Sequence, residues 1–276
     1  MTDRYAVIGN PIAHSKSPQI HLAFARQTGQ DIEYTSLLAP ADGFRVTVES
    51  FRAAGGRGVN VTLPFKLEAF DLADDVSARA KEAQAANFLD FDGGRIRADN
   101  TDGSGLTRDI TGNLGFSIAG RRALLLGAGG AARGVLHPLL AQQPAILTIA
   151  NRTVEKALRL AETFRYHPSA GSSVLSGLRY DELQGRHFDL VINATSSSLQ
   201  GELPPMPAGL FAESALAYDM MYGKGLTPFL KFARSEGAAQ LADGIGMLVE
   251  QAAEAFYLWR GVHPETRPVI DLLRNQ

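Results

Sequence analysis

The sequence predicts an α/β protein of two domains, because its length and its alternation of short strands and helices agree. The chain has 276 residues, of which 45% are hydrophobic, and exceeds the usual size of one compact domain. Short β-rich runs alternate with amphipathic segments through the first hundred residues, and a second such series begins after Gly120. Alternation of this kind favours parallel sheets covered by helices.

In the first series the alternation predicts parallel strands separated by helices. The strands are expected at 5–8, 33–38 and 58–63. The helices are expected at 18–27 and 43–54, followed by a helical stretch that ends near Ala86.

The second series predicts buried strands at 122–126, 146–150, 190–193 and 216–218. A helix over 102–114 is expected to connect the two series. After Gly244, apolar residues spaced three or four apart predict a last amphipathic helix. Its stripe comprises Ile245, Leu248, Ala252, Phe256 and Trp259.

Composition excludes several classes of partner. The 27 Lys and Arg are balanced by 29 Asp and Glu without a basic run, so nucleic acid is not expected as a partner. No apolar stretch reaches the roughly 18 residues of a membrane span, and the first residues lack a signal-peptide core. The absence of cysteine fits a reducing compartment, so a cytoplasmic location is expected.

No metal site is expected either. The six histidines lack the paired spacing of metal ligands. His14 and His21 are interpreted as surface or loop residues.

A glycine motif follows the predicted strand at 122–126. The letters ALLLGAGGAAR place Gly127, Gly129 and Ala132 in the spacing GxGxxA before a predicted helix. The first glycine permits a tight turn, the second lets backbone N–H groups approach a pyrophosphate, and the alanine allows close packing of helix and strand. Close packing alone is the alternative reading, but the strand and helix on either side favour a dinucleotide site.

The end of the next strand favours NADP over NAD. An NAD site places Asp or Glu there against the ribose 2′-hydroxyl, whereas this chain has Asn151, Arg152 and Thr153. A guanidinium can bind a 2′-phosphate through two charge-assisted hydrogen bonds, and Lys156 adds a second charge one turn later. An ordinary exposed arginine at a helix start is the alternative.

Polar residues also follow the predicted strands of the first series. The loop GNPIAHSKSP supplies Ser15 and Ser17, whose hydroxyls could bind a carboxylate, although Ser17 could instead be a helix N-cap. The segment GVNVTLPFK ends in Lys66, and RADNTDG contains Asp102, which could also cap a helix.

Together with NATSSS at 193–198, YDMMYGKGLTPFL at 218–230 and DGIGMLVEQAA at 243–253, these segments resemble the shikimate dehydrogenase family over essentially the whole chain. The resemblance implies NADPH-dependent, reversible reduction of 3-dehydroshikimate to shikimate in aromatic amino acid (chorismate) biosynthesis. It implies an α/β substrate domain at 1–102 with 240–276, an NADP-binding Rossmann domain at 103–239, and a cleft between them. A monomer or a homodimer is expected.

The resemblance also implies roles for individual residues. Lys66 and Asp102 are the expected catalytic pair, which we expect to share a proton. The expected substrate-binding residues are Ser15, Ser17, Thr62, Asn87, Tyr222 and Gln251. The expected cofactor-binding residues are Gly127, Ala128, Gly129, Gly130, Ala131, Asn151, Arg152, Thr153, Lys156, Ala194, Thr195, Met220, Gly244 and Met247.

Two positions depart from the family pattern: Phe88 stands where threonine is common, and Ser198 where glycine is common. Neither removes an expected site residue. Two other functions remain open: a dehydrogenase that also oxidises quinate, and a nonenzymatic NADP sensor. A sensor has no need of both Lys66 and Asp102.

Overall fold

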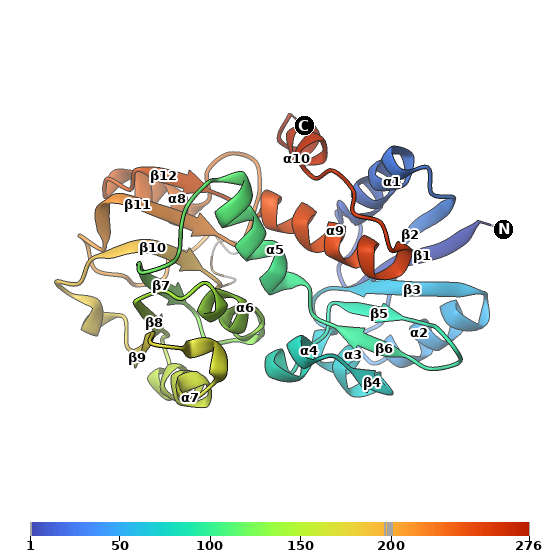
Figure 1. Ribbon diagram of the computed structural model, residues 1–276, viewed down its shortest axis with the longest axis horizontal. Coiled ribbons are helices and arrows are strands. Elements are labelled where there is room, and N and C mark those ends of the chain that lie inside the picture. The colour runs from blue at the N-terminus through green and yellow to red at the C-terminus, as the bar shows by residue number, and fades with distance from the viewer. Residues whose placement is uncertain (1, 196, 198–200, 276) are drawn as a thin grey trace. The chain divides into compact units, whose positions relative to one another are not determined.

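The chain folds into two compact units, each with its own sheet (Figure 1). The computed structural model describes residues 2–195, 197 and 201–275. The first unit comprises the chain up to Gly105 together with the part from Leu248 onward. The second unit comprises Leu106–Met247.

The sheet of the first unit has the order β2-β1-β3-β5-β6-β4. Its strands are β1 (Asp3–Gly9), β2 (Ile32–Leu38), β3 (Gly56–Val61), β4 (Asp75–Val76), β5 (Phe88–Asp90) and β6 (Arg97–Asp99). The predicted parallel pairing is correct for β1, β2 and β3. The sheet is not wholly parallel, because β5, a strand that was not predicted, is antiparallel to both β3 and β6. A short hairpin through Gly93 and Gly94, both with positive φ, joins β5 to β6 and imposes this direction.

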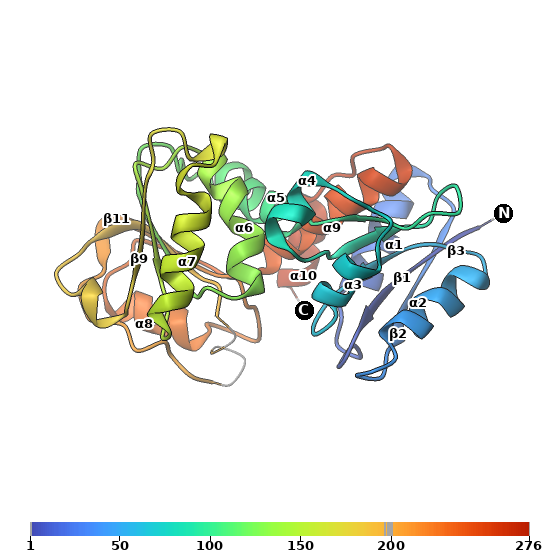
Figure 2. The same ribbon diagram turned by 90° about the horizontal axis from the view of Figure 1, so that it is seen from below.

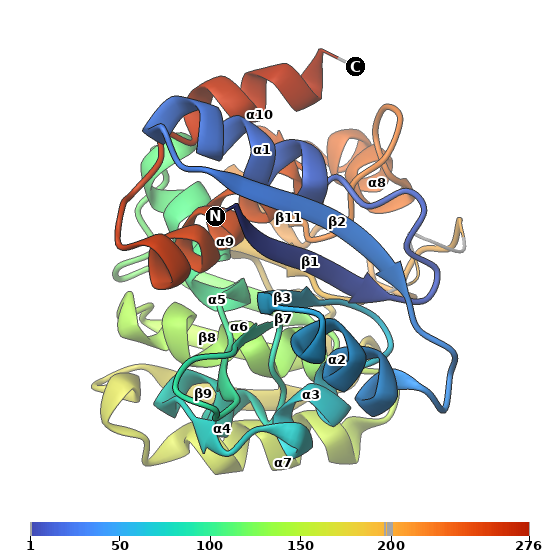
Figure 3. The same cartoon turned by 90° about the vertical axis from the view of Figure 1, so that its right-hand side faces the viewer.

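Helices cover both faces of this sheet (Figure 3). Ala6 and Ile8 of β1 pack with α2 (Phe44–Ala53) and α3 (Lys66–Leu72). Tyr5 and Val7 point to the other face, which α1 (Ser17–Thr28) and α9 (Ile245–Arg260) cover. Alternate residues of the strand are therefore buried on opposite faces.

The helical stretch predicted to end near Ala86 is two helices with a strand between them. The chain leaves α3 at Leu72, and the N–H groups of Asp74 and Asp75 both donate to the Ile96 carbonyl oxygen. This pairing forms β4. The second helix, α4 (Ala78–Ala83), then begins after Ser77, whose hydroxyl caps it by accepting from the Ala80 N–H at 3.1 Å.

The predicted last helix is α9, and its stripe is apolar as expected. Ala252 and Phe256 are fully buried, and Trp259 packs against Tyr5 and Phe88 with centroid distances of 4.5 and 4.9 Å. A further helix, α10 (Arg267–Arg274), was not predicted because its apolar residues span only two turns.

The second unit has an entirely parallel sheet in the order β9-β8-β7-β10-β11-β12. The strands are β7 (Arg122–Leu126), β8 (Ile146–Ala150), β9 (Val174–Leu178), β10 (Phe188–Asn193), β11 (Phe211–Asp219) and β12 (Gln240–Ala242). Counted along the chain this order is 3-2-1-4-5-6, so the prediction of a Rossmann fold is confirmed. The strands β9 and β12 were not predicted, because these edge strands lack long apolar runs.

Both faces of the second sheet are also covered (Figures 1 and 2). Leu125 packs with α6 (Gly130–Ala141) and α7 (Val154–Arg165), whereas Leu124 packs with α8 (Pro228–Ser235). The connecting helix predicted over 102–114 is α5 (Asp102–Arg108), which continues as a π-helical turn, Asp109–Asn113. In the part of the chain that the structure describes, no helix combines the length and apolarity needed to span a bilayer.

Candidate active site

A lysine and a carboxylate meet in the first unit. Lys66 opens α3 after β3, and Asp102 opens α5 after β6. The Lys66 Nζ lies 2.5 Å from the Asp102 Oδ2, and the two side chains are 29% and 12% exposed. The fold thus brings together two residues that lie 36 positions apart, in a place where water screens their charges only in part.

Asn87 extends this pair into a cluster. Its side chain is 3% exposed, and its Nδ2 lies within hydrogen-bonding distance of Asp102 Oδ1 (2.9 Å), Thr101 Oγ1 (2.9 Å) and Gln251 Oε1 (3.1 Å). The Asn87 Oδ1 accepts from the Thr101 N–H at 2.8 Å. We refer to Lys66, Asn87, Thr101, Asp102 and Gln251 as the Lys66 cluster. Thr101 was not among the residues expected in the site.

Asp102 was also considered as a cap of α5. Its side chain instead accepts hydrogen bonds from Lys66 and Asn87. The Asn100 Oδ1 accepts from the Asp102 N–H at 3.1 Å, at the first residue of α5. The Asp102 carboxylate is therefore available to the Lys66 cluster.

The two serines of the first loop lie next to each other. Ser15 Oγ accepts from the Ser17 N–H at 3.3 Å, and Ser17 is the first residue of α1, after the N-cap Lys16. The alternative reading of Ser17 as the N-cap is therefore wrong. Thr62 is half-buried and directly follows β3.

Buried polar groups connect the Ser17 region to Asn87. Burial raises the pKa of Tyr34 well above its usual value, while a hydrogen bond with Ser17 opposes the shift. Tyr34 OH donates to Asn60 Oδ1 at 2.6 Å, and Asn60 Nδ2 donates to the Asn87 carbonyl oxygen at 3.3 Å. Neither Tyr34 nor Asn60 was expected in the site. The signal in the sequence was Asn60, a polar residue inside the apolar strand GVNV.

The interpretation of His21 as a surface or loop residue is wrong. It lies in α1 and is fully buried. Its ring is stacked among aromatic residues, which a single polar letter in the sequence did not reveal.

The glycine loop lies at the carboxyl end of β7 in the second unit. Gly127 has φ +106°, which favours glycine, and a Cβ there would lie 3.3 Å from the Ala194 carbonyl oxygen and 3.2 Å from Thr195 Cγ2. This proximity shows that the ends of β7 and β10 meet at the point where the strand order reverses, where open α/β sheets bind ligands.

The start of α6 fits a dinucleotide pyrophosphate. Gly129 is the N-cap, Gly130 opens the helix, and a Cβ at either residue would meet only open space. Bare backbone is therefore accessible at the positive end of a twelve-residue helix. Ala132 is fully buried, as its expected packing role requires, and Ala128 and Ala131 are half-buried beside it.

The residues expected at the 2′-phosphate follow β8. Asn151 Nδ2 donates to the Thr153 carbonyl oxygen at 2.9 Å and so shapes the turn before α7. Arg152, Thr153 and Lys156 are exposed. The charge of Arg152 lowers the pKa of Tyr180 against the burial that raises it, so the guanidinium lies near that phenol. Two cations are thus available at this strand end.

Gly244 makes the closest backbone approach among the expected cofactor residues. A Cβ there would collide with the Met220 carbonyl oxygen, and its N–H donates to the Met221 carbonyl oxygen at 3.1 Å. Met220 and Met247 are each 8% exposed. Ser196 and Ser198 of the NATSSS segment lie outside the described residues.

The remaining expected residues follow β10 and β11. Ala194 is buried, and Thr195 Oγ1 donates to Asn193 Oδ1 at 2.7 Å. Tyr222 is 37% exposed, and partial burial together with the Asp243 carboxylate raises its pKa.

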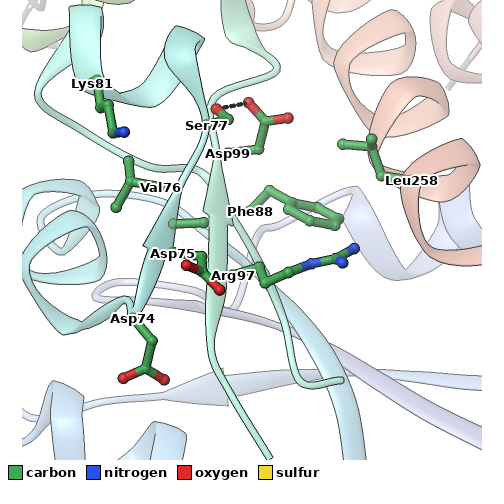
Figure 4. A pocket seen from close by; sticks show the side chains of 10 residues that line it. Asp74, Asp75, Val76, Ser77, Lys81, Phe88, Arg97, Asp99 and Leu258 are labelled. Atoms are coloured by element: carbon green, nitrogen blue, oxygen red, sulfur yellow. Dashed lines mark hydrogen bonds between the residues drawn. The ribbon is translucent and has the colours of Figure 1, made fainter. Parts of the chain in front are cut away.

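A cavity of about 500 Å³ lies elsewhere in the first unit, between β4, β6 and α9 (Figure 4). Phe88, Arg97, Asp99 and Leu258 are among its lining residues. The lining includes none of the expected site residues described above. We place the candidate active site at the Lys66 cluster because proton transfer to a reacting oxygen needs an acid of this kind, whereas volume alone specifies no chemistry.

Three family models match most of the chain. Residues 7–89 match the shikimate dehydrogenase substrate binding domain, residues 109–200 match shikimate/quinate 5-dehydrogenase, and residues 244–274 match the shikimate 5′-dehydrogenase C-terminal domain.

Individual proteins match over their whole length. The chain is 62% identical to "Shikimate dehydrogenase (NADP(+))" of Nitrosospira multiformis over 275 residues, which is 100% of this chain and 98% of the relative. An Ael1 enzyme from Pseudomonas putida has a TM-score of 0.92 at 55% identity, with 99% and 98% of the two chains covered. Shikimate 5-dehydrogenase from Thermus thermophilus in complex with NADP(H) and shikimate has a TM-score of 0.87 at 32% identity, with 99% of each chain covered.

Proposed function

Because the chain belongs to the shikimate dehydrogenase family, we propose that it catalyses the reversible, NADPH-dependent reduction of 3-dehydroshikimate to shikimate. The Lys66 cluster carries this proposal. It presents an ammonium, a carboxylate and two carboxamides within one hydrogen-bonded group, which suits a small substrate bearing several hydroxyls.

Lys66 is the proton donor in the proposed reaction. Bound NADPH supplies the hydride to the carbonyl carbon of the substrate. Negative charge then develops on the carbonyl oxygen, and the Lys66 ammonium stabilises that charge and delivers a proton. Asp102 accepts from Lys66 at 2.5 Å, so it orients the ammonium and shares its proton.

The neighbouring polar groups position the substrate. Asn87 and Gln251 bind its ring hydroxyls together with Asp102, and Thr62 adds a hydroxyl at the end of β3. The substrate carboxylate binds Ser15 and Ser17, which lie next to each other at the start of α1. Tyr222 adds a further substrate contact.

The second unit binds NADP in this proposal. Gly127, Gly129 and Gly130 face the pyrophosphate, with Ala128 and Ala131 beside it, and the backbone is open at Gly129 and Gly130. Arg152 and Lys156 bind the 2′-phosphate at the end of β8, with Asn151 and Thr153. Gly244 would hold the nicotinamide, and Met220, Met247, Ala194 and Thr195 would be the remaining cofactor-binding residues.

The test is a substrate comparison followed at the reduced-nicotinamide absorbance band. The purified protein receives shikimate with NADP, shikimate with NAD, and quinate with each cofactor. The proposal is supported if the protein reduces NADP with shikimate and not with quinate. Oxidation of quinate at a comparable rate replaces it with the dual quinate/shikimate activity, which the name of one matching family model includes.

A nonenzymatic NADP sensor is the second alternative. It predicts that NADP binds while no combination of acid and cofactor reacts. The same preparation therefore needs a calorimetric NADP titration beside the assay. Sedimentation of that sample then decides between the expected monomer and homodimer.

A further inference from the structure

One arginine of the first unit makes hydrogen bonds to three separate segments of the chain. Arg79 lies in α4, and its Nε and Nη2 donate to the two carboxylate oxygens of Asp99 at 3.1 and 2.6 Å. Its Nη1 donates to Ser104 Oγ and to Glu254 Oε1, both at 2.9 Å. We refer to Arg79, Asp99, Ser104 and Glu254 as the Arg79 network.

Two of these partners flank residues of the Lys66 cluster. Ser104 is two positions after Asp102 in the first turn of α5. Glu254 is three positions after Gln251 in α9, so the two side chains lie on the same side of that helix. A single guanidinium therefore links the helix that carries Asp102 to the helix that carries Gln251.

Asp99 connects Arg79 to the remaining members of the Lys66 cluster. Its Oδ1 accepts from Ser77 Oγ at 2.5 Å, as Figure 4 shows, and from the Asn100 N–H at 2.7 Å. The Asn100 Oδ1 in turn accepts from the Asp102 N–H. The Asp99 carbonyl oxygen accepts from the Asn87 N–H at 3.1 Å. The orientation of Asp99 thus fixes the backbone on which Asn87 and Asp102 are held.

Burying the charges of the Arg79 network costs desolvation free energy, so stability alone does not explain the network. The side chains of Arg79, Asp99 and Glu254 are 28%, 12% and 9% exposed, so three charges are largely removed from water. Apolar residues of similar volume often stabilise a protein as well as a buried ion pair does. A planar guanidinium, however, fixes the direction of several partners at once, and an ammonium does not.

We propose that Arg79 is a positioning residue for the reaction assigned above, on which this inference rests. It holds Asp102 and Gln251 at the separation at which Asn87 can contact both. Arg79 does not itself touch the reacting atoms.

The kinetic test compares Arg79→Lys and Arg79→Met with Arg95→Met. Arg95 is a matched control because it pairs with Asp75 at 2.8 Å, but both side chains are exposed. For Arg79→Met we expect the KM for shikimate to rise and kcat to fall by about tenfold or more each, while the KM for NADP changes less than about twofold. Arg79→Lys retains the positive charge but loses the paired N–H donors of the guanidinium. We expect its KM and kcat for shikimate to lie between those of Arg79→Met and the parent.

Arg95→Met keeps all three constants near those of the parent. If Arg79 has a purely structural role, its variants contain less folded protein, but the folded fraction keeps the KM and kcat of the parent. That result overturns the proposal. Urea unfolding measures the folded fraction before the kinetic assay. Ser104→Ala removes one hydrogen bond and serves if Arg79→Met does not fold; we expect a smaller change in the same two shikimate constants, and unchanged constants contradict the proposal.

A second measurement does not depend on activity. In a crystal structure of Arg79→Lys we expect Asn87 Nδ2 and Gln251 Oε1, which are 3.1 Å apart in the parent, to separate beyond hydrogen-bonding distance. An unchanged contact overturns the positioning role even if the protein acts on another substrate. Inactivity of the parent enzyme towards shikimate, in contrast, contradicts only the proposed function.

Discussion

The ring of Tyr34 is stacked on the imidazole of His21, with centroids 4.3 Å apart and planes inclined by 5°. Phe256 and Trp259 enclose the same imidazole at 6.2 and 5.6 Å. This aromatic surrounding excludes water, and burial lowers the pKa of His21 to about 3, although the Asn60 side chain opposes the shift. The histidine is therefore neutral in the folded protein at neutral pH.

We predict that His21 makes the protein sensitive to acid. In the unfolded chain its pKa is about 6.5, so between pH 6.5 and pH 3 the unfolded state binds a proton that the folded state does not. Stability from this source is complete above pH 6.5 and decreases as the pH falls. The loss from pH 7 to pH 5 amounts to about 2 kcal/mol.

Urea unfolding at pH 7 and pH 5 measures this effect. His21→Phe keeps an aromatic ring in the stack and should flatten the pH dependence by about the amount stated above. His14→Asn is the control, because His14 is exposed, and it should unfold with the pH dependence of the parent. Equal pH dependences for His21→Phe and the parent would contradict the prediction.

Replacement of Lys66 by alanine should abolish most of the turnover. The developing negative charge loses its cation and its proton donor, so we expect kcat for shikimate oxidation to fall by about a hundredfold or more. Steady-state rates with NADP measure this. Lys81→Ala removes an exposed ammonium from α4 and should leave kcat within about twofold of the parent. The assigned role is wrong if Lys66→Ala retains more than about a tenth of the parental turnover.

Arg152→Gln should reduce the preference for NADP over NAD. It removes charge-assisted hydrogen bonds to the 2′-phosphate, so kcat/KM with NADP should fall by about tenfold to a hundredfold, while the value with NAD should hardly change. Arg159→Gln, on the exposed surface of α7, is the control. An equal loss with both cofactors would show that Arg152 does not recognise the phosphate.

Gly244→Ala should destabilise the second unit. The new methyl group collides with the Met220 carbonyl oxygen, which is backbone and cannot rotate away, and overpacking of this kind costs about 1–3 kcal/mol. Gly112→Ala is the matched control because its Cβ would meet open space and its φ is not positive. Urea unfolding compares the midpoints of the two variants. Equal midpoints would contradict the prediction.

The features that could be predicted are those encoded in short segments of the sequence. The strands β7 and β8 have the predicted bounds because each is a short apolar run between polar segments, buried on both faces. Lys66 and Asp102 were expected as a pair from the family resemblance, and the structure places them 2.5 Å apart. The direction of β5 was not predicted because it depends on the hairpin that follows it.

The residues that hold the Lys66 cluster in place could not be predicted from short segments. Arg79 and Glu254 are 175 positions apart, and nothing in the helix of either indicates the other. Asn60 stands out as a polar residue in an apolar strand, but only its hydrogen bonds with Tyr34 and with the Asn87 carbonyl oxygen connect the two residues to the site. Contacts between distant segments decide these roles, and one sequence does not contain that information.

The division of the first unit into two stretches of chain determines the order in which the protein can be completed during synthesis. The ribosome adds residues from the N-terminus, so Leu106–Met247 is finished before Phe256 and Trp259 exist. Until then Tyr5 lacks its contact with Trp259, and His21 lacks its contacts with Phe256 and Trp259. The nascent chain therefore carries an open apolar face on its first sheet while the Rossmann fold is already able to close.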